Sequence, residues 1–254
     1  MNILVCIKRV LATGSRINLT PDAQAIDAQY LGFTISPHEE CAVEEAVRLV
    51  EAHGGQSTAL TLGPEVATEQ LRDALALGMD DAVLLETDGR EFDPEATAKA
   101  ITEAVKTRHA SAPLDLILFG NESADRGGYQ VGIRVAHALG WPCITGIKAI
   151  QVDGRTLTAA REGPGGREVF ELPLPAVVGV KEGLNLPRYP SLPGRLKAKK
   201  KPLARQPAPA RDPGLQMLRL KLPPAAAHQV EILGKGAAAA PRVVALFERL
   251  GLLA

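Results

Sequence analysis

The sequence predicts an α/β protein with a doubly wound, mostly parallel sheet, an antiparallel extension of that sheet and an extended C-terminal arm. Three observations lead to this fold class. Short apolar runs alternate with helical patterns up to residue 140, which is typical of a parallel sheet covered by helices on both faces. Hairpin signals follow between residues 143 and 180. A stretch rich in proline and basic residues then precedes a last amphipathic helix at 241–253.

The first strand and the first helix have the clearest local signals. Residues 2–7 form a short apolar run that indicates a buried strand. In the helix that follows, Ser36 is placed as N-cap, Pro37 at the first helical position and Glu39 at the capping-box position. The glycine pair at 54–55 predicts the end of this helix.

The strand–helix alternation then repeats along the chain, and the run before residue 120 is the most apolar of all. We expect strands at 57–63, 81–86 and 114–120, and helices at 64–78, 93–108 and 129–139. Parallel strands joined by helices predict right-handed crossovers.

The sequence pattern changes after Trp141. Turn signals at 153–154 and 163–166 separate several β-like runs and predict the antiparallel part of the sheet. We expect three parts in all: an α/β domain at 1–186, a segment rich in proline and basic residues at 187–205, and an arm at 206–254 that ends in a helix.

Composition and charge exclude several classes of protein. Lysine plus arginine number 29 and aspartate plus glutamate also number 29, so no excess of charge points to nucleic acid. Three scattered cysteines without CxxC spacing favour a reducing compartment and argue against a zinc site. No window approaches the roughly eighteen apolar residues of a membrane span. We expect a cytoplasmic protein, or one of the mitochondrial matrix if the source is eukaryotic.

The loop GNESADRGGYQVG, residues 120–132, is the best candidate for a ligand site. It leaves the carboxyl end of a strand and enters a helix, which is where open α/β sheets bind ligands and where backbone N–H groups receive phosphate. Its spacing is neither GxGxxG nor GxxxxGK[ST]. The pattern alone leaves nucleotide binding and an ordinary connecting loop equally open.

Other candidates gather at the same edge of the predicted sheet. The start of the first helix, the end of the first strand near Cys6, and residues 62–64 after the next strand would wall one pocket. Cys6 itself reads as a small buried hydrophobe. Asp125 with Arg126 fits a loop brace better than a catalytic pair. The five histidines, His38, His53, His109, His137 and His228, share no metal-ligand spacing, so we expect no metal site.

The segment RYPSLPGRLKAKKKP, residues 188–202, has neither helical nor strand periodicity. Leu192 lies between Pro190 and Pro193, and four lysines follow within five positions. A leucine restrained by two prolines beside a cationic run has little use in a core. The residues alone allow either a linker with solvated lysines or a surface that docks a partner.

Several segments together resemble the beta subunit of electron-transfer flavoproteins, in family order over about residues 1–205. These segments are NILVCIKRV, CAVEEAVRLVE, LRDALALGMDDAVLLE, DLILFGNESADRGGYQVG, LPLPAVVGV and RYPSLPGRLKAKKKP. The resemblance implies a Rossmann-like fold of the adenine-nucleotide-binding type and a non-catalytic subunit of an αβ heterodimer that carries electrons.

The resemblance also implies cofactors and partners. The redox FAD is bound mainly by the alpha subunit, while beta holds a structural AMP. The heterodimer takes electrons from acyl-CoA dehydrogenases of fatty acid β-oxidation, which it meets transiently, and passes them to a membrane quinone oxidoreductase. In this scheme 187–205 is a partner-recognition loop and 206–254 packs on the alpha subunit.

Carried over residue by residue, the family pattern implies three sets of site residues. The AMP site falls on Cys6, Ser36, Pro37, His38, Glu39, Leu62, Gly120, Asn121, Glu122, Ser123, Ala124, Asp125, Arg126, Gly127, Gly128, Tyr129, Gln130 and Val131. Partner docking falls on Tyr189, Pro190, Leu192, Pro193, Lys197, Lys199, Lys200 and Lys201, with Leu192 as the anchor. The glutamate beside the flavin falls on Glu162.

Three alternative functions stay open. Bifurcating relatives hold a second FAD in beta and usually carry an Asp-Gly-Asp-Thr run in the nucleotide loop, where this chain has Asp125, Arg126, Gly127 and Gly128. That difference favours AMP. A stand-alone nucleotide-dependent hydrolase would need a phosphate-binding lysine motif, which the sequence lacks. A small nucleotide-binding regulator would leave the basic segment unused.

Overall fold

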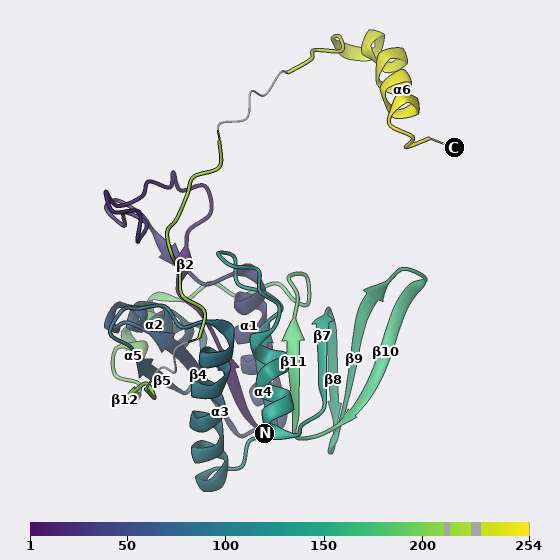
Figure 1. Cartoon of the computed structure of the whole chain (residues 1–254). Coiled ribbons are helices and arrows are strands. Elements are labelled where there is room, and N and C mark those ends of the chain that lie inside the picture. The colour runs from purple at the N-terminus through teal and green to yellow at the C-terminus, as the bar shows by residue number, and fades with distance from the viewer. Residues whose placement is uncertain (211–213, 225–229, 254) are drawn as a thin grey trace.

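The computed structural model describes residues 1–210, 214–224 and 230–253. Its main sheet has seven strands in the order β12-β5-β4-β1-β6-β11-β7, and all neighbouring strands run parallel. The strands are β1 (Asn2–Cys6), β4 (Gln56–Gly63), β5 (Asp81–Glu86), β6 (Leu116–Gly120), β7 (Cys143–Ile147), β11 (Ala176–Val180) and β12 (Leu203–Pro207). The predicted α/β fold with a mostly parallel sheet is therefore confirmed (Figure 1).

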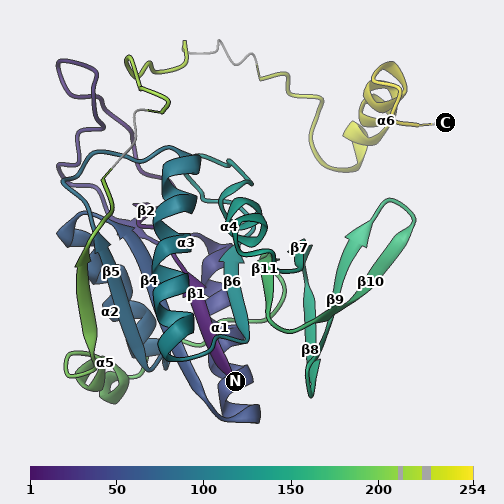
Figure 2. The same cartoon turned by 60° about the horizontal axis from the view of Figure 1, so that its bottom comes forward.

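Helices cover both faces of this sheet (Figure 2). One face carries α1 (Pro37–His53) and α2 (Thr68–Leu77), which follows the 3-10 helix η1 (Glu65–Ala67), and the other carries α3 (Pro94–Ser111) and α4 (Val131–Leu139). Side chains alternate along β1, so Ile3 and Val5 pack toward α1 and α2 while Leu4 and Cys6 pack toward α3 and α4. This two-sided burial explains why the strands read as continuous apolar runs.

The helix ends follow their local signals. The Ser36 hydroxyl accepts a hydrogen bond from the Glu39 N–H, and the Glu39 carboxylate accepts one from the Ser36 N–H, which confirms the capping box of α1. Gly54 ends the helix with a positive φ of 69°, which favours glycine. Asp93 caps α3 by accepting from the Ala96 N–H at 2.8 Å.

The predicted antiparallel part is confirmed as a three-stranded sheet of its own, in the order β10-β9-β8. Its strands are β8 (Ala149–Asp153), β9 (Thr156–Gly163) and β10 (Gly166–Pro173), and the β9–β10 hairpin projects away from the main sheet (Figure 1). A short hairpin of β2 (Val10–Leu11) and β3 (Phe33–Thr34) follows β1.

The segment 188–202 contains regular structure, although its sequence has neither helical nor strand periodicity. Leu192–Ala198 form helix α5. Ser191 caps it by accepting a hydrogen bond from the Gly194 N–H at 3.1 Å, and the first turn of the helix tolerates Pro193. The chain then enters the main sheet as β12, parallel to β5. The expected boundary at residue 205 therefore falls inside a strand, and Pro207 is accommodated because β12 is an edge strand.

The last part of the C-terminal arm, residues 230–253, stands away from the main sheet and from the three-stranded sheet (Figure 1). The 3-10 helix η2 (Gly236–Ala239) leads into α6 (Ala240–Arg249), and α6 has no buried residue. In the part of the chain that the structure describes, no helix combines the length and the apolar character needed to cross a membrane.

Leu118 in β6 tests the contribution of the central strand to the core, since its side chain is fully buried. We expect Leu118→Ala to lower the free energy of unfolding by about 2–5 kcal/mol, because it leaves a cavity between the sheet and its helices. Urea denaturation followed by circular dichroism measures this. Leu186→Ala is the matched control, because Leu186 is 84% exposed, and a loss as large as that of Leu118→Ala would contradict the prediction.

Candidate functional site

A cavity of about 260 Å³ lies at the carboxyl ends of β1, β4, β5 and β6, between the starts of α1, α3 and α4. Its walls are built by the segments that follow these four strands, as expected for the ligand-binding edge of a parallel sheet. The lining residues include the apolar Leu60, Leu62, Ile101 and Phe119 and the cationic Lys8, Arg9, Arg90 and Arg126. The volume is slightly below the roughly 300–1,000 Å³ of drug-sized ligand sites, so it suits a small ligand.

The loop after β6 approaches the start of α1 very closely. A Cβ atom at Gly120 would lie 2.7 Å from the Cγ of Glu39, so only glycine fits there. The next residue, Asn121, donates its N–H to the Val180 carbonyl at 2.8 Å, which fixes the loop to β11. Gly120 therefore permits the contact that brings the loop after β6 onto the first helix.

The same loop presents the start of α4 toward the cavity. Gln130 is the N-cap residue and makes no capping hydrogen bond with its side chain, and Gln130, Val131 and Gly132 all line the cavity. Gly127 and Tyr129 have positive φ values of 54° and 55°. Uncapped N–H groups at the start of a helix form an anion-binding arrangement, which the helix dipole strengthens.

Glu39 is the most unusual ionisable group of the site. Its side chain is buried, and its carboxylate accepts hydrogen bonds from the Lys8 N–H and the Ser36 N–H, each at 3.0 Å. Burial raises the pKa of Glu39 from its ordinary value near 4.5 to about 8, although these two N–H donors and the nearby Lys8 charge act in the opposite direction. The carboxyl group joins the end of β1 to the start of α1.

Ion pairs connect the loops around the cavity. Lys8 after β1 pairs with Asp125, Arg126 pairs with Glu91 in the loop after β5, and His38 Nε2 lies 3.4 Å from the Glu122 carboxylate. Asp125 and Arg126 thus each reach a different loop, which agrees with the expected loop brace. A hydrogen bond to the Glu122 carboxylate raises the pKa of the Tyr129 hydroxyl.

Cys6 and the start of α1 form the floor of the site. Cys6 is buried, and desolvation raises the pKa of its thiol well above the ordinary range, so it is a small hydrophobe and not a thiolate nucleophile.

His109 has a structural role at the end of α3. Its Nδ1 accepts a hydrogen bond from the Leu114 N–H, and its ring packs against the Trp141 ring.

The structure brings most of the implied nucleotide residues together. Twelve of them line the cavity: Cys6, Glu39, Leu62, Gly120, Asn121, Glu122, Ser123, Arg126, Gly128, Tyr129, Gln130 and Val131. The other six, Ser36, Pro37, His38, Ala124, Asp125 and Gly127, lie in the supporting turns and do not line it. Ser36 and Asp125 instead bind the lining residues Glu39 and Lys8.

Sequence reasoning missed one wall of the cavity. The loop between β5 and α3 contributes Thr87, Arg90, Glu91 and Phe92, and Arg9 enters from the segment after β1. Arg90 pairs with Asp88, and the Arg9 guanidinium stacks on the Phe33 ring. The position of this loop at the carboxyl end of a predicted strand was the available signal, because that edge is shared by all parallel strands.

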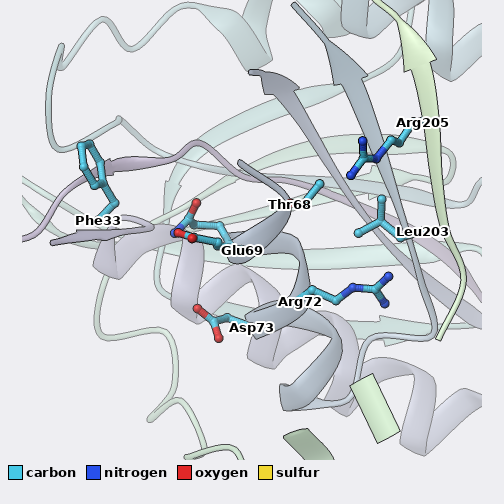
Figure 3. Close-up of a pocket in the computed structure, with 8 residues that line it drawn as sticks. Phe33, Thr68, Glu69, Arg72, Asp73, Leu203 and Arg205 are labelled. Carbon is cyan, nitrogen blue, oxygen red and sulfur yellow. The ribbon is translucent and has the colours of Figure 1, made fainter. Parts of the chain in front are cut away.

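A larger, open groove of about 560 Å³ lies elsewhere, between α2, β3 and the edge strand β12. Figure 3 shows both acidic and basic side chains along it, with Glu69 and Asp73 on the side of Phe33 and Arg72 and Arg205 on the side of Leu203. Both arginines have partners: Arg72 donates to the Ala198 and Lys201 carbonyls, and Arg205 pairs with Glu65. This groove has neither a free cationic cluster nor an apolar wall for a nucleotide.

The segment 188–202, called the docking segment below, is largely exposed. Leu192 is 73% exposed, and Tyr189, Lys197, Lys199 and Lys200 are also exposed. Pro190 is half-buried and Pro193 exposed. Lys201 differs from the other lysines, because its ammonium group donates to three backbone carbonyls of the globule.

Glu162 lies in β9, outside the cavity. Its side chain is exposed and pairs with Lys148 at 2.9 Å, and this cation lowers the pKa of the Glu162 carboxyl. Among the residues that the structure describes, no group of three or more histidine, cysteine or acidic side chains is arranged to hold a metal ion, while His228 lies outside those residues.

Comparisons with known proteins agree with the fold. The model of the electron transfer flavoprotein domain matches residues 25–211. The beta subunit of the electron transfer flavoprotein of Bacillus subtilis is 42% identical over 80% of this chain and 77% of its own length. The corresponding subunit of Syntrophomonas wolfei is 37% identical over 91% of this chain and 90% of its own length, and that of Mycobacterium leprae is 39% identical over 79% and 76%.

The fold is that of an α/β protein with a ligand cavity at the carboxyl edge of a parallel sheet. Within that class, this chain belongs to the electron transfer flavoprotein family, among the beta subunits. It is therefore related to flavin-dependent electron carriers that consist of two different subunits.

Glu39 gives a pH dependence with a defined sign. Its pKa is about 8 in the folded protein and near its ordinary value of 4.5 in the unfolded chain, so the folded state holds an extra proton between these values. The free energy of unfolding should therefore fall as pH rises from about 4.5 to about 8.

Glu39→Gln should flatten this part of the stability curve, because glutamine does not titrate. Urea denaturation at several pH values measures the slope. Glu103→Gln, on the exposed face of α3, is the matched control. An unchanged slope in Glu39→Gln would show that the buried carboxyl is not the group responsible.

Proposed function

We propose that this chain is the non-catalytic beta subunit of a heterodimeric electron carrier, with a structural AMP in the cavity described above and the redox FAD bound mainly by the alpha subunit. The FAD would accept electrons from acyl-CoA dehydrogenases and related enzymes, and the heterodimer would deliver them to a membrane quinone oxidoreductase. One observation carries the AMP assignment: twelve residues implied as nucleotide contacts line a single cavity at the start of α4.

The residues of the cavity fit a mononucleotide. The phosphate would meet the uncapped N–H groups at the start of α4, where Gly128 and Gly132 let the ligand approach the backbone. The apolar side chains Leu60, Ile101 and Phe119 offer a surface for the base. When bound, AMP supplies charge and shape to the beta subunit and takes no part in electron transfer.

The cationic side chains of the cavity would mainly close its loops and leave phosphate binding to the backbone. Lys8, Arg90 and Arg126 each pair with a carboxylate and Arg9 stacks on Phe33, so most of the positive charge of the site is already engaged. A dinucleotide with two phosphates and a second ring system needs more charge and more volume than about 260 Å³. This supports AMP over the second FAD of bifurcating relatives.

The exposed parts of the chain support the assignment of two different partners. Leu192 is presented on a capped helix, so little conformational freedom is lost when a dehydrogenase buries it. Burial of one leucine contributes about 1.5–3 kcal/mol, which orients a partner without holding it for long. The apolar side chains of α6 and its C-cap residue, among them Val244, Phe247 and Leu250, are partly exposed and offer a surface for the alpha subunit.

The nucleotide content of the purified heterodimer tests the assignment directly. We expect one FAD and one AMP per heterodimer after denaturation, because the cavity accommodates a mononucleotide. Chromatography of the released nucleotides with a flavin absorbance spectrum measures both. Two FAD and no AMP would establish the bifurcating alternative, and a colourless heterodimer without nucleotide would overturn the whole assignment.

Leu192→Ala tests docking. The KM of the heterodimer for a reduced acyl-CoA dehydrogenase should rise about tenfold, because the anchor loses most of its apolar surface. Bound flavin and the maximal rate of flavin reduction should stay unchanged. Leu186→Ala removes a leucine that is 84% exposed and lies outside both the docking segment and the C-terminal arm, and it is the control. Equal kinetics in Leu192→Ala and wild type would contradict the docking role.

A further inference from the structure

The docking segment is fixed to α1 at its first residue. The Arg188 guanidinium binds the Glu44 carboxylate with two N–H groups, at 2.9 and 3.2 Å, and the Glu51 carboxylate with two more, at 2.8 and 3.0 Å. Its backbone N–H also donates to Glu44 at 3.1 Å. Glu44 is buried, so this fork is a charge-assisted contact with limited solvent screening.

The last lysine of the run fixes the other end to α2. Lys201 Nζ donates to the carbonyls of Leu75, Gly78 and Met79, at 3.2, 3.2 and 2.5 Å. These are carbonyl groups at and just after the C-terminus of α2, where the helix dipole favours a cation. The three donors of one ammonium group are therefore satisfied by the globule itself.

The contact between α2 and α5 is reciprocal. Arg72 of α2 donates to the Ala198 and Lys201 carbonyls, at 2.7 and 2.8 Å, and thereby caps the end of α5. Lys201, which follows α5, caps the end of α2 in turn. Each helix thus ends against a cation supplied by the other side of the contact.

Apolar burial contributes little to the position of α5. Ala198 is 2% exposed and belongs to the main core, whereas Leu192 and Leu196 are 73% and 56% exposed. A Cβ atom at Gly194 would lie 2.8 Å from the Ala76 carbonyl oxygen, so the two helices are in close contact. Polar contacts hold α5 in place and leave its leucines free.

We propose that Arg188 and Lys201 are positioning residues for partner docking, which hold the docking segment in one conformation on α1 and α2, and that Lys201 does not belong to the cationic surface that attracts the partner. This inference rests on the proposed docking function of Leu192. The four lysines then have two different roles, because Lys197, Lys199 and Lys200 face solvent whereas Lys201 serves the scaffold.

The expected consequences separate the two roles. Lys201→Met should raise the KM for a reduced acyl-CoA dehydrogenase about tenfold at every ionic strength, because the segment must be ordered upon binding. Lys200→Met, the matched control, removes a solvent-exposed charge from the same segment. It should weaken the dependence of the KM on salt without loosening the segment.

The experiment uses the heterodimer with bound flavin. Hydrogen exchange measured by mass spectrometry reports the order of residues 192–200, and flavin reduction at several salt concentrations gives the KM and the maximal rate. The variants are Lys201→Met, Lys201→Arg, Arg188→Lys and Lys200→Met. Lys201→Arg keeps a cation with N–H donors and should retain much of the wild-type protection against hydrogen exchange. Arg188→Lys loses the forked contact with Glu44 and Glu51 and should lose this protection.

The result that supports the proposal is faster exchange in Lys201→Met and Arg188→Lys with a raised KM, an unchanged maximal rate and an unchanged dependence on salt. Hydrogen exchange at the wild-type rate in both Lys201→Met and Arg188→Lys overturns the proposal. Faster exchange in these variants with a wild-type KM also overturns it, provided that Leu192→Ala raises the KM. If Leu192→Ala has no effect either, the proposed docking function fails. The exchange data then decide alone whether the two cations hold the segment.

Discussion

The buried carboxyl of Glu39 is the contact on which the rest of the site depends. It accepts hydrogen bonds from the backbone N–H groups of Lys8 and Ser36, and Gly120 packs directly against its side chain. Three segments distant in sequence, which follow β1, precede α1 and follow β6, therefore meet at one group. Those contacts offset only part of the free energy cost of burying this carboxyl, which is why its pKa is raised, and the cavity forms around them.

The molecule has a packed centre and exposed outer parts. The main sheet and its helices hold the cavity, whereas the docking segment, the β9–β10 hairpin and α6 lie at the outside of the molecule. The docking segment connects the exposed outer parts to the packed centre, because β12 joins the main sheet directly after it. A carrier that must bind and release partners repeatedly benefits from such a fixed but exposed contact, since little order has to be created on binding.

The charged side chains of this protein act mainly on neighbouring groups. The chain has equal numbers of basic and acidic residues, and most charged groups near the cavity form pairs that connect loops, such as Lys8 with Asp125. Lys197, Lys199 and Lys200 are exposed at the end of α5, whereas Lys201 and Arg188, on either side of this helix, are engaged with the globule. A weak, oriented encounter needs a few exposed charges and no large excess.

Local signals in the sequence determined much of this structure. The capping residues Ser36 and Glu39, the apolar strands and the turn at 163–166 act through neighbours in the chain, so the elements that they build could be predicted. Only the tertiary structure decided that 203–207 becomes an edge strand, that Arg90 and Phe92 line the cavity, and that Lys201 binds the end of α2. Those outcomes depend on contacts between residues far apart in sequence, which leave no periodic pattern in the segments concerned.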